Sequence, residues 1–237
     1  MSASESVGLI LHSRRFRENS RIIEVFTHEY GRIALVARVA SKKAGSRSSG
    51  LQPFQESLFR WRGKGELQNL QSLDSLTIFK LKDTATICGM YCNELLMCLT
   101  EKFLPLSDLY LSYRNTLESL THTKSLSLPL REFEMTLLEH LGYGLNLETD
   151  CLTAEPLLNS GDYYYHAQQG FSRQSPGRDA LKIEAQILEQ IRNRDFSEQK
   201  VARQAKIILG SSIQFQLGNR QLKSRQLLHS IAKYSHE

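Results

Sequence analysis

Long apolar runs are missing from this chain of 237 residues. No stretch approaches the roughly 18 consecutive apolar residues of a membrane-spanning helix, so we expect neither a membrane span nor a membrane partner. The first residues lack the basic start and long apolar centre of a secretion signal, which favours a cytoplasmic protein. Hydrophobic residues make up 41% and charged residues 23%, a composition that excludes a wholly disordered chain and fits one or two globular domains.

Cysteine is scarce as well. Cys88, Cys92 and Cys98 fall in one apolar, helix-like stretch, and Cys151 stands alone. A disulfide scaffold would be denser in cysteine, and structural zinc needs paired short spacings of Cys or His that do not occur here. We therefore expect buried thiols, no metal and no cofactor.

Catalytic motifs are also lacking. Gly63-Lys64-Gly65 is followed by Glu66 and not by a helix start, so it is no phosphate loop, and there is no HExxH or GxSxG. The seven histidines are scattered without a paired spacing. These absences predict a protein that is not an enzyme, although an enzyme with catalytic residues dispersed along the chain stays an alternative.

Positive charge is concentrated in the first third of the chain. Residues 1–80 hold 13 Lys and Arg against 7 Asp and Glu, whereas residues 81–237 hold 17 against 18. No acid lies between Arg38 and Glu56, where the basic arm SKKAGSRSSG occupies residues 41–50. This asymmetry indicates a basic module on a near-neutral body, and a solubilising surface is the alternative.

The first 80 residues predict strands. In RIALVARV, residues 32–39, apolar and more polar positions alternate with the period of a half-buried strand. Similar short segments occur at 8–13, 21–27, 54–62 and 66–73, with glycine turns at 28–31 and 63–65 and without helices between them. We expect a small antiparallel barrel, of either the SH3-like or the five-stranded Greek-key type.

Beyond residue 82 the period becomes helical. We expect a helix over residues 84–104 that Pro105 ends, a second with Ser107 as its N-cap, and a third that Gly142 stops. Residues 145–178 are predicted to be loop-like, with a small hairpin across 168–170. Two or three further helices are expected up to residue 234, with interruptions at Gly210 and Gly218.

Arginines and aromatic residues alternate in the predicted barrel beside the basic arm. Lys and Arg neutralise phosphates and release counterions, and aromatic rings stack unpaired bases for about 1–3 kcal/mol each. For Phe59 and Trp61 we favour the barrel core over stacking. A second, weaker basic group comprises Arg203, Lys206, Arg220, Lys223 and Arg225. The main candidate nucleic-acid-binding residues are Arg14, Arg15, Arg17, Arg38, Lys42, Lys43, Arg47, Arg60, Arg62 and Lys64.

The chain resembles the RecO recombination-mediator family from end to end. The resemblance rests on VGLILHSRRFRENSRIIEVFTHEYGRIALVARVASKK, on LQPFQESLFRWRGKGEL and most specifically on LREFEMTLLEHLGYGLNLETDC. It implies an α+β multidomain protein with an N-terminal OB-fold β-barrel over residues 1–80. An α-helical domain over 81–237 would follow, with a loop or hairpin insertion near 145–178.

The resemblance also implies a function in DNA repair and recombination. Family members bind single- and double-stranded DNA and anneal complementary strands coated with the single-stranded DNA-binding protein. With RecR, and in some settings RecF, they help load RecA at gaps, which places them at the nucleoid in the cytoplasm. Some members hold zinc through four cysteines after the GYG segment, but only Cys151 remains here, so no metal is carried over.

One partner site is implied by the family motif. The acidic tail of the single-stranded DNA-binding protein docks on the helical domain, and the matching residues are Arg131 and Leu138. A guanidinium suits a terminal carboxylate, while an ordinary helix-start arginine and a core leucine are the alternatives. For the function of the whole protein, the competing hypothesis is a general RNA-binding OB module with a helical partner domain.

Overall fold

The computed structural model describes residues 3–38, 51–177 and 180–234. The basic arm, with Lys42, Lys43 and Arg47, lies outside the described residues. Contacts divide the chain into a barrel unit, residues 1–123 and 222–237, and a second unit, residues 124–221. Strands give way to helices near residue 80, and the domain boundary expected there stays a prediction.

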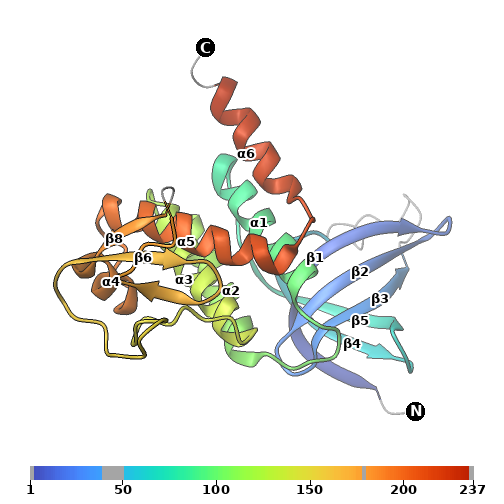
Figure 1. Ribbon diagram of the computed structural model, residues 1–237. Helices are drawn as coiled ribbons and strands as arrows, with labels where there is room; N and C mark the ends of the chain where they lie inside the picture. Colours follow the sequence, from blue (N-terminus) through green and yellow to red (C-terminus); the bar gives the residue numbers. More distant parts are fainter. Residues whose placement is uncertain (1–2, 39–50, 178–179, 235–237) are drawn as a thin grey trace. The chain divides into compact units, whose positions relative to one another are not determined.

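Five strands of the barrel unit form a closed barrel in the order β1-β2-β3-β5-β4 (Figure 1). They are β1 (Ser4–Phe16), β2 (Ser20–Thr27), β3 (Gly31–Arg38), β4 (Gln55–Arg62) and β5 (Leu67–Ile78). Neighbouring strands are antiparallel except β3 and β5, which pair in parallel, so the expectation of a fully antiparallel barrel is corrected in this one pair. The parallel pair is what a five-stranded barrel requires when β4 lies between β5 and β1.

Alternating side chains from the strands fill the barrel. Ile33, Leu35 and Ala37 of β3 join one buried core cluster, as the period-two pattern predicts. Phe59 and Trp61 of β4 belong to the same cluster and are 0% and 2% exposed. Their preferred assignment to the core is confirmed, and neither ring is available to stack a base.

Three helices of the barrel unit, α1 (Asp83–Leu99), α2 (Ser107–His122) and α6 (Lys223–Tyr234), complete it. Outward-facing Phe26 of β2 packs against Tyr110 of α2, with ring centroids 6.0 Å apart. The buried side chain of Asn93 in α1 donates a hydrogen bond to the carbonyl of Leu11 at 2.9 Å. The helices therefore cover an apolar outer face of β1 and β2.

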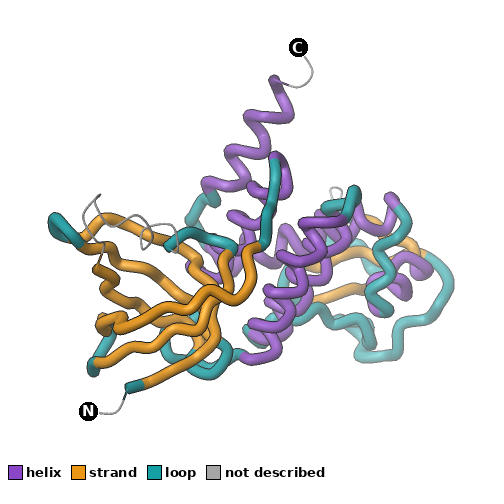
Figure 2. The backbone as a smooth tube through the Cα atoms, turned by 180° about the vertical axis from the view of Figure 1, so that it is seen from behind, coloured by secondary structure: helices purple, strands orange, loops and turns teal. Residues whose placement is uncertain are grey.

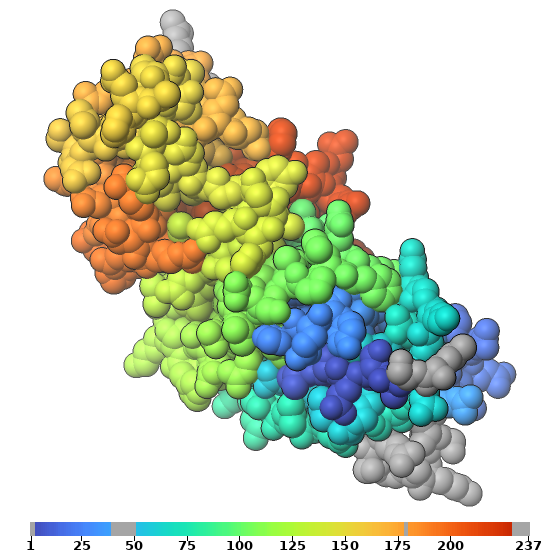
Figure 3. All heavy atoms as spheres, turned by 90° about the horizontal axis from the view of Figure 1, so that it is seen from below, coloured from blue at the N-terminus to red at the C-terminus, as the bar shows by residue number. Residues whose placement is uncertain are grey.

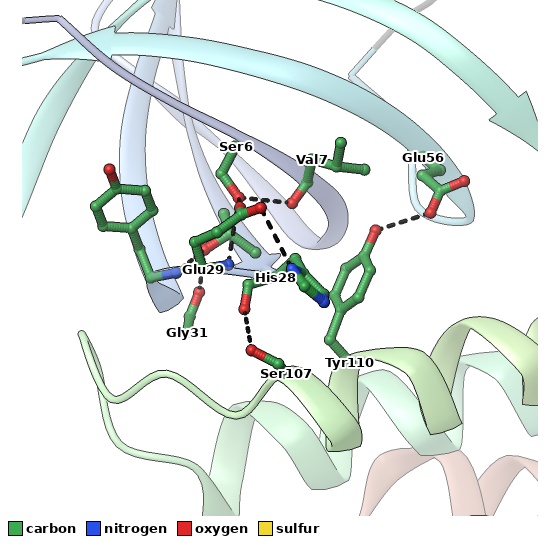
Figure 4. Close-up of polar contacts among 10 residues, drawn as sticks. Ser6, Val7, His28, Glu29, Gly31, Glu56, Ser107 and Tyr110 are labelled. Carbon is green, nitrogen blue, oxygen red and sulfur yellow. Dashed lines mark hydrogen bonds and ion pairs between the residues drawn. The ribbon is translucent and has the colours of Figure 1, made fainter.

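Polar contacts fix the start of α2 to the β2–β3 turn (Figure 4). The Ser107 hydroxyl donates to the His28 carbonyl at 3.0 Å, and the His28 ring packs edge-on against Tyr110. The Tyr110 hydroxyl donates to the buried carboxylate of Glu56 at 2.8 Å, and burial together with that carboxylate raises the pKa of Tyr110. Figure 3 shows the green part of the chain, which includes α2, directly against the blue strands of the barrel.

Two helix boundaries differ from the expectation. Helix α1 ends at Leu99, before Pro105, because the next segment lies along β3, where the Phe103 amide donates to the Arg32 carbonyl at 3.0 Å. Helix α2 begins at Ser107, but the Ser107 hydroxyl does not cap it. That hydroxyl is engaged with the β2–β3 turn instead.

The second unit combines helices with a small sheet. Its elements are α3 (Ser127–His140), β6 (Asp162–His166), β7 (Gly170–Ser172), β8 (Lys182–Glu184), α4 (Ala185–Arg192) and α5 (Gln199–Leu217). The predicted hairpin is confirmed by the antiparallel pairing of β6 with β7, while the third strand, β8, was not expected. Helix α3 stops before Gly142 as predicted, but α5 runs unbroken through Gly210.

The close approach at Gly31 gives a stability prediction. Its φ is +65°, and a Cβ there would lie 1.9 Å from the Leu104 carbonyl oxygen, so Gly31→Ala forces backbone apart as well as straining φ. We expect a loss of about 2–4 kcal/mol in the free energy of unfolding. Urea denaturation followed by the fluorescence of Trp61, the single tryptophan, measures it.

Gly65 provides the matched control for that substitution. Its φ is +85°, but a Cβ there meets no atom within 4 Å, so Gly65→Ala should cost only about 1 kcal/mol of backbone strain. Equal losses for the two variants would show that the contact with Leu104 is unimportant.

Docking of α6 on α1 should depend on pH through Glu94. This carboxylate accepts hydrogen bonds from the Lys223 and Ser224 amides and the Ser224 hydroxyl at 2.6–3.0 Å. Partial burial acts to raise the pKa of Glu94, but these hydrogen bonds outweigh it and the pKa lies below the ordinary value. Because the folded pKa is depressed, the stabilisation is present above the ordinary Glu pKa and is lost as pH falls through the folded value.

Glu94→Gln should accordingly weaken protection of the α6 amides at neutral pH by about 1–2 kcal/mol. Hydrogen exchange of α6 measures this, and the difference from wild type should disappear as the pH falls through the lowered pKa of Glu94. Glu101→Gln, which changes an exposed acid just beyond α1, is the control and should leave α6 unaffected. Equal protection in the wild type and Glu94→Gln at neutral pH contradicts this function of Glu94.

Candidate nucleic-acid interface

The β1–β2 hairpin contains the first group of basic residues that the sequence predicts to bind nucleic acid. Arg14 pairs with Ile22 and Arg15 with Arg21, and the turn follows at residues 17–19. Arg14, Arg15 and Arg17 are exposed, and the Arg17 guanidinium lies over the half-buried Phe16 ring, 5.1 Å from its centroid. The turn places these three arginines within four residues at one tip of the barrel.

Strand register brings Arg38 and Arg62 toward the same side. Arg38, at the end of β3, is paired with Ser20 at the start of β2. Asn69 of β5 connects β3 to Arg62, since it pairs with Val36 on one side and with Arg62 on the other. Figures 1 and 2 show the β1–β2 hairpin, the end of β3 and the β4–β5 turn on the side of the barrel away from α1 and α2. The β1–β2 and β4–β5 loops are those with which OB-folds bind oligonucleotides.

Arg21 belongs to this surface although the sequence did not single it out. It lies directly opposite Arg15, and two residues before the core residue Ile23. Its Nε donates to the Ser13 hydroxyl at 2.7 Å and its Nη2 to the Ser13 carbonyl at 3.2 Å. Arg21 is two positions from Ile23 on the same strand, so the alternating pattern places it on the side that faces the core. For this reason the sequence did not indicate Arg21 as a binding residue.

Like charges directly opposite each other destabilise a sheet by about 0.2–1 kcal/mol. Arg15 and Arg21 form such a pair, and Arg38 lies one residue farther along β3 than Ala37, the partner of Arg21. In the described parts of the chain, no acid forms an ion pair with Arg14, Arg15, Arg17, Arg21 or Arg38. A bound anion would convert this repulsion into attraction.

Arg60 differs from its neighbours on β4. Its guanidinium forms ion pairs with both Glu5 of β1 and Asp74 of β5. Hydrogen bonds to Asp74 and then Glu5 raise its pKa. Arg62 and Lys64 are exposed and have no ion pair among the residues described. The structure therefore separates Arg60, whose charge is compensated, from Arg62 and Lys64, whose charges are not.

The described residues contain no group of three or more His, Cys, Asp and Glu side chains that could hold a metal ion. Within the same residues, every helix is too short or too polar to cross a bilayer.

Two family models match this chain. They are Recombination protein O N terminal over residues 1–79 and Recombination protein O C terminal over residues 84–226. The chain belongs to the RecO family. It is 36% identical to the DNA repair protein RecO of Methylococcus capsulatus over 93% of this chain and 91% of that protein. It is also 36% identical to the RecO of Nitrosococcus oceani and 34% identical to a RecO of Escherichia coli, each over 94% of this chain and 92% and 93% of the relative.

Membership of the RecO family confirms the resemblance and the fold expected from it. The first model ends with β5 and the second begins within α1, so both follow the change from a closed barrel to helices. The relatives are DNA repair proteins by name, which places the basic barrel surface in a family that works on DNA.

The implied tail-binding residues of the RecO motif lie inside helix α3. Arg131 is 4% exposed and forms an ion pair with Glu134, one turn on, with Nη2 and Oε1 2.8 Å apart. Leu138 is 0% exposed. The exposed helix-start arginine considered as the alternative is therefore not what the structure shows. A peptide could reach Arg131 and Leu138 only after α3 rearranges, and their role as a tail site stays a prediction.

The buried Arg131–Glu134 pair predicts a large effect on stability. Arg131→Ala leaves the Glu134 carboxylate buried without its guanidinium and should cost about 3–5 kcal/mol, measured by chemical denaturation followed by far-UV circular dichroism. The double variant Arg131→Met with Glu134→Leu removes both charges and should recover most of that loss. Glu132→Ala, at an exposed neighbour, is the control. A small loss for Arg131→Ala alone would contradict the importance of the pair.

Proposed function

We propose that this chain is a DNA-binding recombination mediator that works without catalysis. It binds single- and double-stranded DNA and anneals complementary strands coated with the single-stranded DNA-binding protein. With RecR it helps load RecA at gaps. The observation that carries the proposal is the uncompensated arginine cluster at the loop side of a five-stranded barrel, in a chain of the RecO family.

Phosphate contact explains how such a surface promotes annealing. Arg15, Arg21 and Arg38 offer guanidinium groups from three adjacent strands, which lie about 4.8 Å apart in a sheet. Guanidinium groups bind phosphate oxygens in two-pronged geometry. Neutralised phosphates repel a second strand less strongly, while the base edges stay free to pair. The basic arm, with Lys42, Lys43 and Arg47, would extend this phosphate contact.

Recruitment to coated DNA is the second part of the proposal. The acidic, Phe-ending tail of the single-stranded DNA-binding protein docks on the helical part of the chain through Arg131 and Leu138. Both residues are on α3, seven residues or about two turns from one another. A guanidinium near an apolar side chain suits a carboxylate beside a phenyl ring. Because both are buried, docking requires α3 to open locally.

Arg62 and Arg60 form a matched pair for testing the barrel surface. Both are arginines on β4, but only Arg60 has its charge compensated by acids. Arg62→Gln should reduce the slope of log affinity for single-stranded DNA against log salt by about 0.7, the value of one phosphate contact. Arg60→Gln should leave that slope unchanged. Fluorescence anisotropy titrations at several salt concentrations measure both.

An annealing assay tests the complete proposal. Complementary oligonucleotides, coated with the cognate single-stranded DNA-binding protein with or without its acidic tail, are mixed with wild type or the Arg15→Gln, Arg21→Gln double variant. Faster annealing that requires both the tail and the two arginines is expected. Intact DNA binding without accelerated annealing would overturn the mediator function, and a clear preference for structured RNA would favour the RNA-binding hypothesis.

A further inference from the structure

The end of the chain contains a second basic region that the barrel does not explain. Between Glu198 and Glu237 there is no Asp or Glu, although seven Lys and Arg residues occur there. This stretch contains the whole of α5 in the second unit and of α6 in the barrel unit. A run of one charge sign over about 38 residues is unusual for helices that only pack and solubilise, because such helices normally carry charges of both signs.

Helix α5 has a buried side and a basic solvent side. Val201, Ala205, Ile208 and Ser212 are buried, with α3 and α4 as the neighbouring helices. The solvent side follows the spacing of three and four residues expected for one face of a helix. The exposed residues along this α5 solvent face are Arg203, Lys206, Ile207, Ser211, Gln214 and Phe215.

The two cations of the α5 solvent face are one turn apart and uncompensated. Among the described residues, neither Arg203 nor Lys206 takes part in an ion pair, whereas Lys200 at the start of the helix is paired with Glu184 at 2.8 Å. One turn farther along, Gly210 has no side chain, so a ligand could approach the helix backbone closely beyond Lys206. These features suit a phosphate backbone lying across the helix.

Phe215 supplies an aromatic ring on the same helix. It is 62% exposed, the largest value among the exposed large hydrophobic residues of the described chain. It lies nine residues beyond Lys206, or about 14 Å along the helix axis. The adjacent positions of its own helix, Ser211, Gln214 and Gly218, are small or polar, so this helix provides no apolar wall for a partner's side chain. An open ring beyond a pair of cations is the combination that binds single-stranded nucleic acid.

An acidic peptide fits this face less well than a nucleic acid does. The hollow beside the first turn of α5 is lined by Glu184, Glu189 and Glu198, which repel any anionic ligand, so it offers no docking pocket to an acidic peptide. A peptide that docks through an apolar side chain also needs a pocket, and Phe215 projects from the helix with small and polar neighbours. The open ring and the lack of a pocket for a peptide side chain therefore favour a strand with stacked bases.

We propose that the α5 solvent face is a second nucleic-acid-binding surface, where Arg203 and Lys206 hold phosphates and Phe215 stacks a base of a single strand. The proposal rests on the proposed DNA-binding function of the barrel and extends it, because each compact unit then holds a strand of its own. A protein that brings two strands together needs two such surfaces on one molecule.

The test measures capture of a second strand that cannot anneal. Full-length protein is bound at low surface density through a biotinylated oligo-dT, so that each molecule is isolated, and a fluorescent oligo-dT is then added. Phe215→Ala and the double variant Arg203→Gln, Lys206→Gln should each capture the second strand about tenfold more weakly, while their affinity for the first strand stays unchanged. Lys124→Gln with Lys182→Gln removes two exposed cations elsewhere in the second unit and is the control.

Each alternative outcome is distinguishable. Capture of only one strand by the wild type, or equal second-strand capture by the wild type and both α5 variants, overturns the second surface and leaves the barrel function intact. Loss of binding to an acidic, Phe-ending peptide with both strands still held would show a peptide-docking face instead. Failure of the wild type to bind even the first strand would overturn the proposed function itself.

Discussion

The barrel depends on strand β1 pairing along both of its edges. Residues 4–9 pair with β4 and residues 8–16 pair with β2, so this one strand joins the two ends of the sheet. Gly8 lies where the two pairings overlap, and a Cβ there would come within 2.8 Å of the Val25 side chain. Closure leaves no free edge for another chain to extend, and it determines where the arginine-bearing hairpin leaves the barrel.

One part of the outer surface of these strands packs against helices, and another part is an exposed basic surface. Along β1, Leu9 and Leu11 are buried, whereas Arg14 and Arg15 are exposed. Burying the first part against α1 and α2 removes apolar area from water at roughly 25 cal/mol per Å². It also leaves the basic part as the accessible surface. The anchoring of α2 to the β2–β3 turn keeps the helices at that side of the barrel unit.

Local sequence patterns predicted the strands and helices, whereas the ion pairs, helix ends and burial of particular residues depend on partners that are distant in the sequence. The alternation in β3, the arginines of the β1–β2 hairpin and the stop at Gly142 follow from neighbours in sequence, so they were predictable. The compensation of Arg60 could not be predicted, because Glu5 is 55 residues away. Helix α1 also ends earlier than predicted because of a distant partner: the segment after it is hydrogen-bonded to β3. For Arg131 the partner is only three residues away, but its burial depends on the packing of the whole second unit.

The contrast among arginines bears on function more directly than net charge does. Where a cation is structural, this chain supplies an acid, as Glu134 for the buried Arg131 and Glu5 and Asp74 for Arg60. Arg15 and Arg21 face each other without one, although an acid opposite either would relieve their repulsion. A surface that keeps such repulsion in the free protein is less stable alone than with an anion bound, so its free energy of binding includes the relief of that repulsion. The same reasoning applies to α5, where Arg203 and Lys206 remain uncompensated within an acid-free stretch.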